Sequence, residues 1–271
     1  MSDDVNAPKG PIGRFLALSP DSITKTLVVA IGLCLFCSMI VSIAAVSLRP
    51  VQEANRLVDK RRNILEVVGI SEPGMDVNAV FTQRIEPRVV DLTTGKFTDR
   101  FDPASFDDAA AADDPALSTE LADDPAGIGR RANFRTVYLL NGEDGTLERI
   151  VLPVHGYGLW STLYGFVALG ANGNDIHGLQ FYEHAETPGL GGEVDNPLWI
   201  EQWAGRKVRD DNGDMRITVS KTAPSAEGQV YHVDALAGAT LTSRGVDNLV
   251  RFWLGDQGFG PFLANLKNGE A

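Results

Sequence analysis

Hydroxyl side chains gather where a helix is predicted to begin near the C-terminus. The segment DALAGATLTS runs from Asp234 to Ser243 and places Thr240, Thr242 and Ser243 directly before an apolar periodic run. A helix N-terminus combines free backbone N–H groups with the positive end of the helix dipole, so it favours a bound phosphate. An ordinary helix cap uses the same residue types. From the residues alone we therefore keep both interpretations, a phosphate site and a cap.

Two further segments combine glycines with hydroxyls and large apolar side chains. They are GYGLWST, from Gly156 to Thr162, and ETPGLGG, from Glu186 to Gly192. Glycine permits a close approach of the backbone, and such a mixture suits a flat heteroaromatic ring with polar edges. Turn formation is the alternative for each segment. Neither segment is a strand-GxGxxG-helix fingerprint, so a Rossmann nucleotide site is not supported.

The elements that must position these segments form a mixed α+β domain. Apolar residues at helical spacing predict a helix over 243–254, and a second helix is predicted over 196–204. Short β-branched or aromatic runs between turn residues predict strands. These runs are 136–140, 147–154, 164–169, 176–183, 216–220 and 230–234. Because few long helices separate successive strands, we expect an antiparallel sheet.

An apolar run lies near the N-terminus. Residues 26–48 carry no charge, and as a helix they reach roughly 35 Å, enough to cross a bilayer core of about 30 Å. The run predicts one transmembrane helix rather than a cleaved signal peptide. Cys34 and Cys37 lie within it, where packing is a better interpretation than redox chemistry. Flanking Lys and Arg residues slightly favour a cytoplasmic C-terminal domain. Pro50 is expected to begin an amphipathic connector that ends near Gly69.

Charge is unevenly distributed along the chain. The net charge of -12 opposes binding of nucleic acid, and much of it comes from residues 101–126, with eight acids and no base. We expect this stretch to be a solvated insertion that does not fold, so that deletion of 103–125 leaves the domain intact. The predicted divisions are a tail 1–25, a transmembrane helix 26–48, a connector and domain start 49–100, an acidic insertion 101–132 and a folded domain 133–271.

Several blocks, in order, resemble a known family, the C subunits of the sodium-translocating NADH:quinone oxidoreductases. The blocks are SLRPVQEANRLVDKRRNIL, GYGLWSTLYGFVAL, HAETPGLGGEV, NPLWIEQWAGRKV and DALAGATLTS. The resemblance implies a single N-terminal span followed by an antiparallel-sheet domain that binds FMN. The last block is similar to the family's flavinylation motif, Asp-x-x-Ser/Thr-Gly-Ala-Thr. It departs at Ala237, where that motif has Ser or Thr.

The resemblance also implies a set of site residues. Thr240 takes the position of the threonine joined to the FMN phosphate, with Asp234, Gly238 and Ala239 in the motif and Thr242 as the alternative acceptor. Two groups of residues are then expected to line the flavin, one from each glycine-bearing segment. They are Leu159, Trp160 and Thr162, and Glu186, Thr187, Gly189 and Leu190. Lys207 and Arg206 are expected either to offset charge on the reduced flavin or to form surface ion pairs. The spacing of the four histidines predicts no metal site.

The functional expectation follows from the same resemblance. The chain is expected to be a single-pass component of a six-subunit complex in the bacterial inner membrane, with its domain in the periplasm, and to have no complete activity alone. Its covalent FMN would relay electrons between an intramembrane iron–sulfur centre and a second flavin on the B subunit. Expected partners are the B, D and E subunits and a flavin transferase. The G subunit of the Rnf electron-transport complex is the alternative within this class. A membrane-anchored binding module without a cofactor is the alternative from another class.

Overall fold

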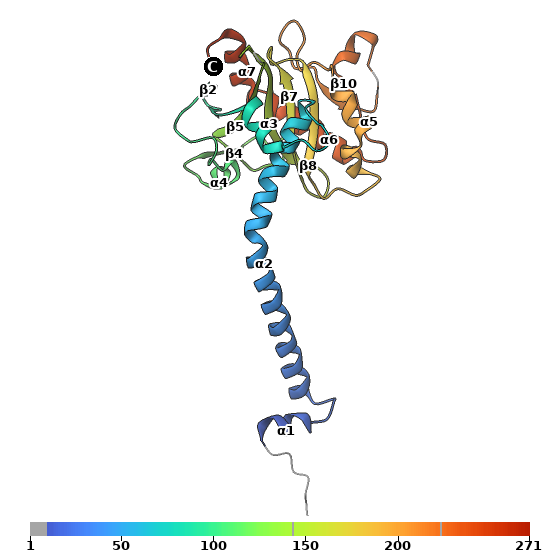
Figure 1. Cartoon of the computed structure of the whole chain (residues 1–271). Helices are drawn as coiled ribbons and strands as arrows, with labels where there is room; N and C mark the ends of the chain where they lie inside the picture. Colours follow the sequence, from blue (N-terminus) through green and yellow to red (C-terminus); the bar gives the residue numbers. More distant parts are fainter. Residues whose placement is uncertain (1–9, 143, 223) are drawn as a thin grey trace, which may run out of the picture. The chain divides into compact units, whose positions relative to one another are not determined.

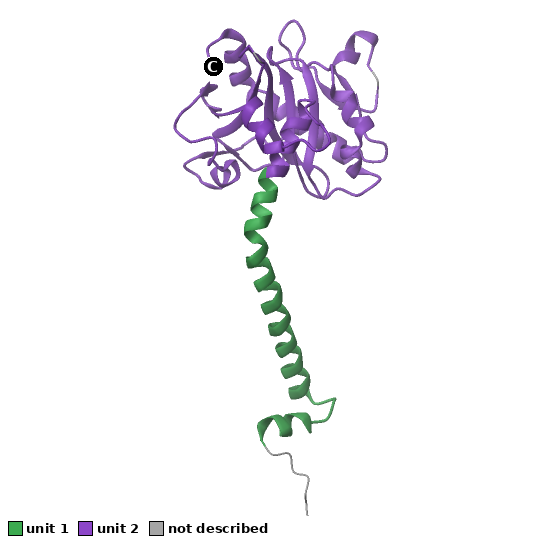
Figure 2. Ribbon diagram, in the orientation of Figure 1, with its two compact units in different colours: residues 1–57 green, residues 58–271 purple. Residues whose placement is uncertain are grey.

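The structure, a computed structural model, divides into two compact units, residues 1–57 and 58–271 (Figure 2). It describes residues 10–142, 144–222 and 224–271. The first nine residues of the predicted N-terminal tail lie outside this range. The elements of each unit follow in chain order, with the labels of Figure 1.

The first unit is helical. Helix α1 covers Pro11–Leu16, and α2 covers Ile23–Val67, so it begins in the first unit and ends in the second. The predicted span 26–48 lies wholly within α2. Within the described residues, α2 is the one helix long and apolar enough to cross a membrane.

The expectation that a new helix begins at Pro50 is wrong, because α2 passes through this residue without a break. Proline removes one helical hydrogen bond and costs roughly 3 kcal/mol in a helix interior. The helix continues because its last turns bury Ile64, Leu65 and Val67 in the domain. It ends two residues before Gly69, whose φ of 78° is a left-handed conformation suited to glycine.

The second unit contains short helices around strands. Its α-helices after α2 are α3 (Val77–Arg84), α4 (Asp108–Asp113), α5 (Pro197–Ile200), α6 (Thr240–Leu254) and α7 (Gly260–Asn268). Its 3-10 helices are η1 (Gly191–Asp195), η2 (Glu201–Trp203) and η3 (Ala226–Tyr231). Its strands are β1 (Ile85–Asp91), β2 (Lys96–Phe97), β3 (Ser118–Glu120), β4 (Arg130–Ala132), β5 (Phe134–Asn141), β6 (Leu147–Tyr157), β7 (Thr162–Gly170), β8 (Ile176–Glu183), β9 (Thr218–Ser220) and β10 (His232–Asp234).

The main sheet has the order β2-β1-β5-β6-β7-β8 and is antiparallel throughout. This confirms the predicted α+β class with an antiparallel sheet. Strand β1 was not predicted, because Pro87 lies in it and proline lacks the N–H that a central strand needs. The short β2 pairs only with Val90 and Asp91, so β1 is an edge strand at Pro87.

Strands β9 and β10 form a separate two-stranded sheet in which they run parallel. The sequence predicted both runs, and it was wrong to assign them to the antiparallel sheet. Parallel neighbours need a crossover connection rather than a tight turn. Residues 221–231, which include η3, provide the connection here. This small sheet precedes α6 closely in the chain: β10 ends at Asp234 and α6 begins at Thr240.

Each face of the main sheet carries its own core. On one face, α6 and α7 cover residues such as Leu152, Leu163 and Val167. On the other, the end of α2 and α3 cover Val151 and Phe166. Figure 1 shows these helices around the strands of the sheet. The sheet is therefore the central layer, and α6 is fixed along one side of it by its buried apolar stripe.

The acidic segment is folded, so the expectation that it cannot fold is wrong. It contains α4 and β3, and Ala111 and Ala126 are buried. Two of its acids make specific contacts: Asp107 caps α4, and the carboxylate of Asp108 lies 3.7 Å from Arg135 Nε. Composition could not reveal this because the positive partner lies outside the segment. The boundaries of the segment at residues 101 and 132 stay predictions.

Candidate functional site

The three hydroxyls at the start of α6 have different environments. Thr242 is fully buried, and its Oγ1 donates a hydrogen bond of 2.7 Å to Glu186 Oε2. Ser243 is also buried; its Oγ donates to the carbonyl of Ala239 and accepts from the N–H of Leu236. Thr240, the first residue of α6, is exposed. Two of the hydroxyls therefore hold the loop together, and the third faces solvent.

None of these hydroxyls caps the helix. The residue before α6 is Ala239, and no side chain within the described residues bonds to the first N–H groups. Four N–H groups at any helix start lack an intrahelical partner. Gly238, with φ of 76°, turns the chain into the helix without blocking this end. The N-terminus of α6 therefore has donors and a positive dipole available for an anion next to an exposed threonine hydroxyl.

Glu186 ties three segments together at this point. Its side chain is 5% exposed. Oε1 accepts hydrogen bonds from the backbone N–H groups of Leu159, Trp160 and Ser161 at 3.0, 2.9 and 3.3 Å, while Oε2 accepts from Thr242. Burial raises the pKa of Glu186, but the hydrogen bonds from Thr242 and the loop amides outweigh burial, so its pKa lies below the ordinary value. The carboxylate is thus a buried, fully engaged anion that fixes the β6–β7 turn against α6.

Two glycines permit this close approach. A Cβ at Gly191 would lie 2.5 Å from Thr242 Oγ1 and 2.7 Å from Glu186 Oε2. A Cβ at Gly245, on α6, would lie 2.5 Å from the carbonyl oxygen of Tyr157. Any larger residue at either position would force the backbone apart. The predicted need for glycine in the 186–192 segment is therefore a packing requirement around Glu186.

Large apolar side chains remain exposed on the same loops. Trp160 is 67% exposed, and Leu159, Leu190 and Leu241 are also exposed. Leu190 lies beside the start of α6, because a Cβ at Gly238 would be 3.1 Å from its Cδ2. In the same segment, the carbonyl of Thr187 accepts from the N–H groups of Leu190 and Gly192, and Gly189 takes φ of 76°. Exposed apolar side chains thus lie on the segments that meet at the uncapped start of α6.

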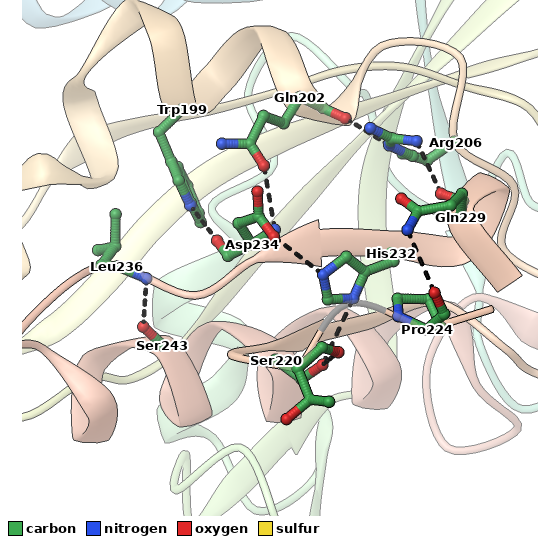
Figure 3. Close-up of polar contacts among 11 residues, drawn as sticks. Trp199, Gln202, Arg206, Ser220, Pro224, Gln229, His232, Asp234, Leu236 and Ser243 are labelled. Carbon is green, nitrogen blue, oxygen red and sulfur yellow. Dashed lines mark hydrogen bonds and ion pairs between the residues drawn. The ribbon is translucent and has the colours of Figure 1, made fainter. Parts of the chain in front are cut away.

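The chain leading into this loop is held by the network in Figure 3. The carbonyl of Asp234 accepts a hydrogen bond of 2.8 Å from Trp199 Nε1. The backbone N–H of Asp234 donates a hydrogen bond of 3.0 Å to Gln202 Oε1. The Asp234 carboxylate lies 3.1 Å from Nε2 of buried His232. Asp234 therefore fixes the end of β10 through both its backbone and its side chain.

Two predicted residues, Lys207 and Thr162, make no contact with Glu186 in the described structure. The backbone of Lys207 forms an isolated β-bridge with Asp175, in the turn between β7 and β8. This turn follows the end of β7 at Gly170, roughly 26 Å along the strand from its start at Thr162. Neighbouring Arg206 bonds to the carbonyls of Gln202 and Gln229. Thr162 borders a cavity beside α4. Successive side chains of a strand point to opposite faces of the sheet, so Thr162 and Leu163 point to different faces, and Leu163 packs in the core with α6. The predictions that Lys207 and Thr162 line the flavin stay predictions.

The sequence analysis missed the supporting residues. Ser161 Oγ accepts a hydrogen bond of 2.7 Å from the N–H of Ala185, and His184 Nε2 lies 2.7 Å from Asp195 Oδ2. These contacts join segments whose pairing no local pattern indicates. Within the described ranges, no three His, Cys, Asp or Glu side chains are grouped so that they could hold a metal ion.

Comparison with known proteins identifies the class to which this fold and site belong. Residues 158–255, which include the Glu186 loop and α6, match the FMN-binding domain family. The chain is 52% identical over 258 residues to the C subunit of the Na(+)-translocating NADH-quinone reductase of Pseudomonas aeruginosa, covering 93% of this chain and 98% of that protein. It is 51% identical to the corresponding protein of Vibrio vulnificus, covering 93% and 98%. The chain therefore belongs to the family of C subunits of this oxidoreductase complex.

Solved structures agree with this assignment. The crystal structure of Shewanella oneidensis NqrC has a TM-score of 0.74 and 34% identity, covering 79% of this chain and 99% of that chain. The crystal structure of the C subunit from Parabacteroides distasonis has a TM-score of 0.60 and 26% identity, covering 81% and 96%. The chain is thus a component of an NADH-quinone reductase and contains an FMN-binding domain.

Proposed function

We propose that the chain carries FMN joined through its phosphate to Thr240 and relays electrons within the reductase complex. The observation that carries this proposal is the difference in exposure between the two threonine hydroxyls at the start of α6. Thr240 is exposed, whereas Thr242 is buried and its hydroxyl is hydrogen-bonded to Glu186. A transferase can reach only an exposed hydroxyl. Thr240 is therefore the acceptor that the geometry favours over Thr242.

The residues present suit this cofactor. The backbone N–H groups at the start of α6 would bind the phosphate, and Gly238 leaves the helix end open. Leu159, Trp160 and Leu190 would contact the ring from the Glu186-tied loops, and Glu186 would hold the first two in place. Bound FMN supplies reversible electron transfer, which no side chain of this site supplies. The protein contributes position, exclusion of water and a fixed environment.

The test of attachment compares substitutions at the two threonines. Thr240→Ala, made together with the flavin transferase, is expected to abolish flavin fluorescence in a denaturing gel, because only covalent flavin survives denaturation. Thr240→Ser keeps a hydroxyl at the same place and is the matched control that should retain fluorescence. Thr242→Ala should also retain it. Loss of fluorescence in Thr242→Ala with retention in Thr240→Ala would move the acceptor to Thr242.

We further propose that α2 anchors the chain in the bacterial inner membrane with the domain in the periplasm. The apolar run and the membership of this family support an anchor, and large domains translocate largely regardless of flanking charge. The B, D and E subunits are the proposed neighbours in the complex. A reporter active only in the periplasm, fused after Ala271, should be active. Activity of a reporter that works only in the cytoplasm would reverse the orientation.

A further inference from the structure

The cavity that Thr162 borders lies beside α4. Its volume is about 620 Å³, within the range of roughly 300–1,000 Å³ that small-molecule sites occupy. Its walls include Lys60, Arg135, Tyr164 and Tyr182, and neither Thr240 nor Glu186 lines it. Of the residues predicted to line the flavin, Thr162 alone borders this cavity.

Arg135 is the unusual residue of this cavity. It is 6% exposed, yet a guanidinium carries five N–H donors. Its polar contacts are long: Nη2 lies 3.4 Å from the carbonyl of Pro153, and Nε lies 3.7 Å from Asp108 Oδ2. Its guanidinium also lies over the Trp253 ring, 4.8 Å from the ring centroid. Nε is buried and has no hydrogen-bond partner in the described part of the chain. Since a buried charge is costly unless it is well bonded, an acceptor that reaches the Nη groups of Arg135 from the cavity would be stabilised by this guanidinium.

The surrounding charges favour a ligand with a single acidic group. Lys60, Arg130 and Arg135 line the cavity together with three acids, Asp107, Asp108 and Asp113. Asp107 already caps α4, and Asp108 Oδ1 accepts from the N–H and hydroxyl of Thr136. These hydrogen bonds leave the two carboxylates less able to satisfy the arginine. The formal charges of the lining balance, so a polyanion is not favoured.

Aromatic faces form much of the remaining wall. Tyr182 is 41% exposed and stacks on Phe166 with ring centroids 5.0 Å apart, and Tyr164 stacks on His155 at 5.6 Å. Burial, followed by the charge of Arg135, lowers the pKa of His155 to about 3, so this ring is neutral at pH 7. Burial raises the pKa of Tyr182 to about 12, so its hydroxyl remains a donor. Exposed ring faces beside a cation suit a flat aromatic ligand.

We propose that this cavity binds a planar aromatic monoanion, an aromatic carboxylate, with its acid on Arg135 and its ring against Tyr164 and Tyr182. The site is separate from Thr240 and does not depend on flavin attachment. No covalent or redox step is involved.

The test is calorimetric titration of the purified full chain with 2-naphthoate. We expect saturable binding, at least about tenfold tighter than that of the neutral analogue 2-naphthalenemethanol, because only the carboxylate can form charge-assisted hydrogen bonds to Arg135 through two oxygens. Arg135→Gln should abolish the preference for the carboxylate. Tyr182→Ala should weaken the binding of 2-naphthoate by about tenfold, because an aromatic face on which the ligand ring stacks is lost. Leu198→Ala, an exposed residue that does not line the cavity, is the control and should bind like the wild type.

Three results would overturn the proposal. The first is no saturable binding of 2-naphthoate to the wild type. The second is equal affinity for the acid and the alcohol. The third is wild-type affinity in Tyr182→Ala, and this variant decides the matter if Arg135→Gln fails to fold, because the Tyr182 ring is partly exposed.

Discussion

Two buried charges in the second unit are held in opposite ways. Glu186 accepts four hydrogen bonds from the β6–β7 turn and α6. Arg135, buried to the same degree, lies over the Trp253 ring but has only one long hydrogen bond and one distant carboxylate among the described residues. The difference teaches that burial alone does not reveal the role of a charge. A fully bonded charge fixes structure, whereas an incompletely bonded one leaves donors for a ligand.

The largest expected effect follows from removal of the fully bonded charge. Glu186→Ala leaves three amides and one hydroxyl without their acceptor and should lower the free energy of unfolding by more than about 3 kcal/mol. Glu186→Gln should cost less, because its carbonyl can still accept from the amides and the Thr242 hydroxyl can accept from its NH₂. Urea unfolding of the second unit measures both.

The control for this prediction is Glu183→Ala, at an exposed position of β8, which should change stability by less than about 0.5 kcal/mol. Equal stability of Glu186→Ala and Glu183→Ala would show that the bonded carboxylate does not hold the loops. The contrast between the two buried charges would then fail.

A second prediction uses the burial of His155, to which the charge of Arg135 adds a smaller effect. Because the pKa of His155 falls from 6.5 to about 3 on folding, the unfolded state binds a proton at higher pH than the folded state. Stability from this group is complete above the unfolded pKa and is lost as pH falls from about 6.5 towards 3. Between pH 7 and pH 5 the loss should be about 2 kcal/mol. His155→Gln should remove this part of the pH dependence, as measured by urea unfolding at both pH values. An unchanged pH dependence in His155→Gln would contradict the assignment.

A smaller effect is expected from the hydroxyl that completes the Glu186 cluster. Thr242→Val keeps the shape of the side chain but leaves Glu186 Oε2 without its donor, which should cost about 1–2 kcal/mol. Thr240→Val is the matched control, because Thr240 is exposed and caps nothing within the described residues. A control variant as destabilised as Thr242→Val would show that the two hydroxyls do not differ in structural role.

Much of the fold was predictable because it rests on local patterns. The runs that became β5 to β8 alternate or carry β-branched residues, and the apolar stripe of α6 has helical spacing. Strand β1 was missed because Pro87 argues against a strand unless an edge is available. The acidic segment was misjudged because its ion-pair partner Arg135 lies elsewhere in the chain.

The sequence by itself determined the apolar helix, the antiparallel domain and the positions of the hydroxyls and glycines before α6. Only the tertiary structure decided which hydroxyl is free. Thr240 and Thr242 are two residues apart and so face different sides of α6, and just one side meets Glu186. It also placed Lys207 beside the β7–β8 turn and Thr162 at the cavity beside α4, because contacts between distant segments depend on sheet register, which single residues do not encode.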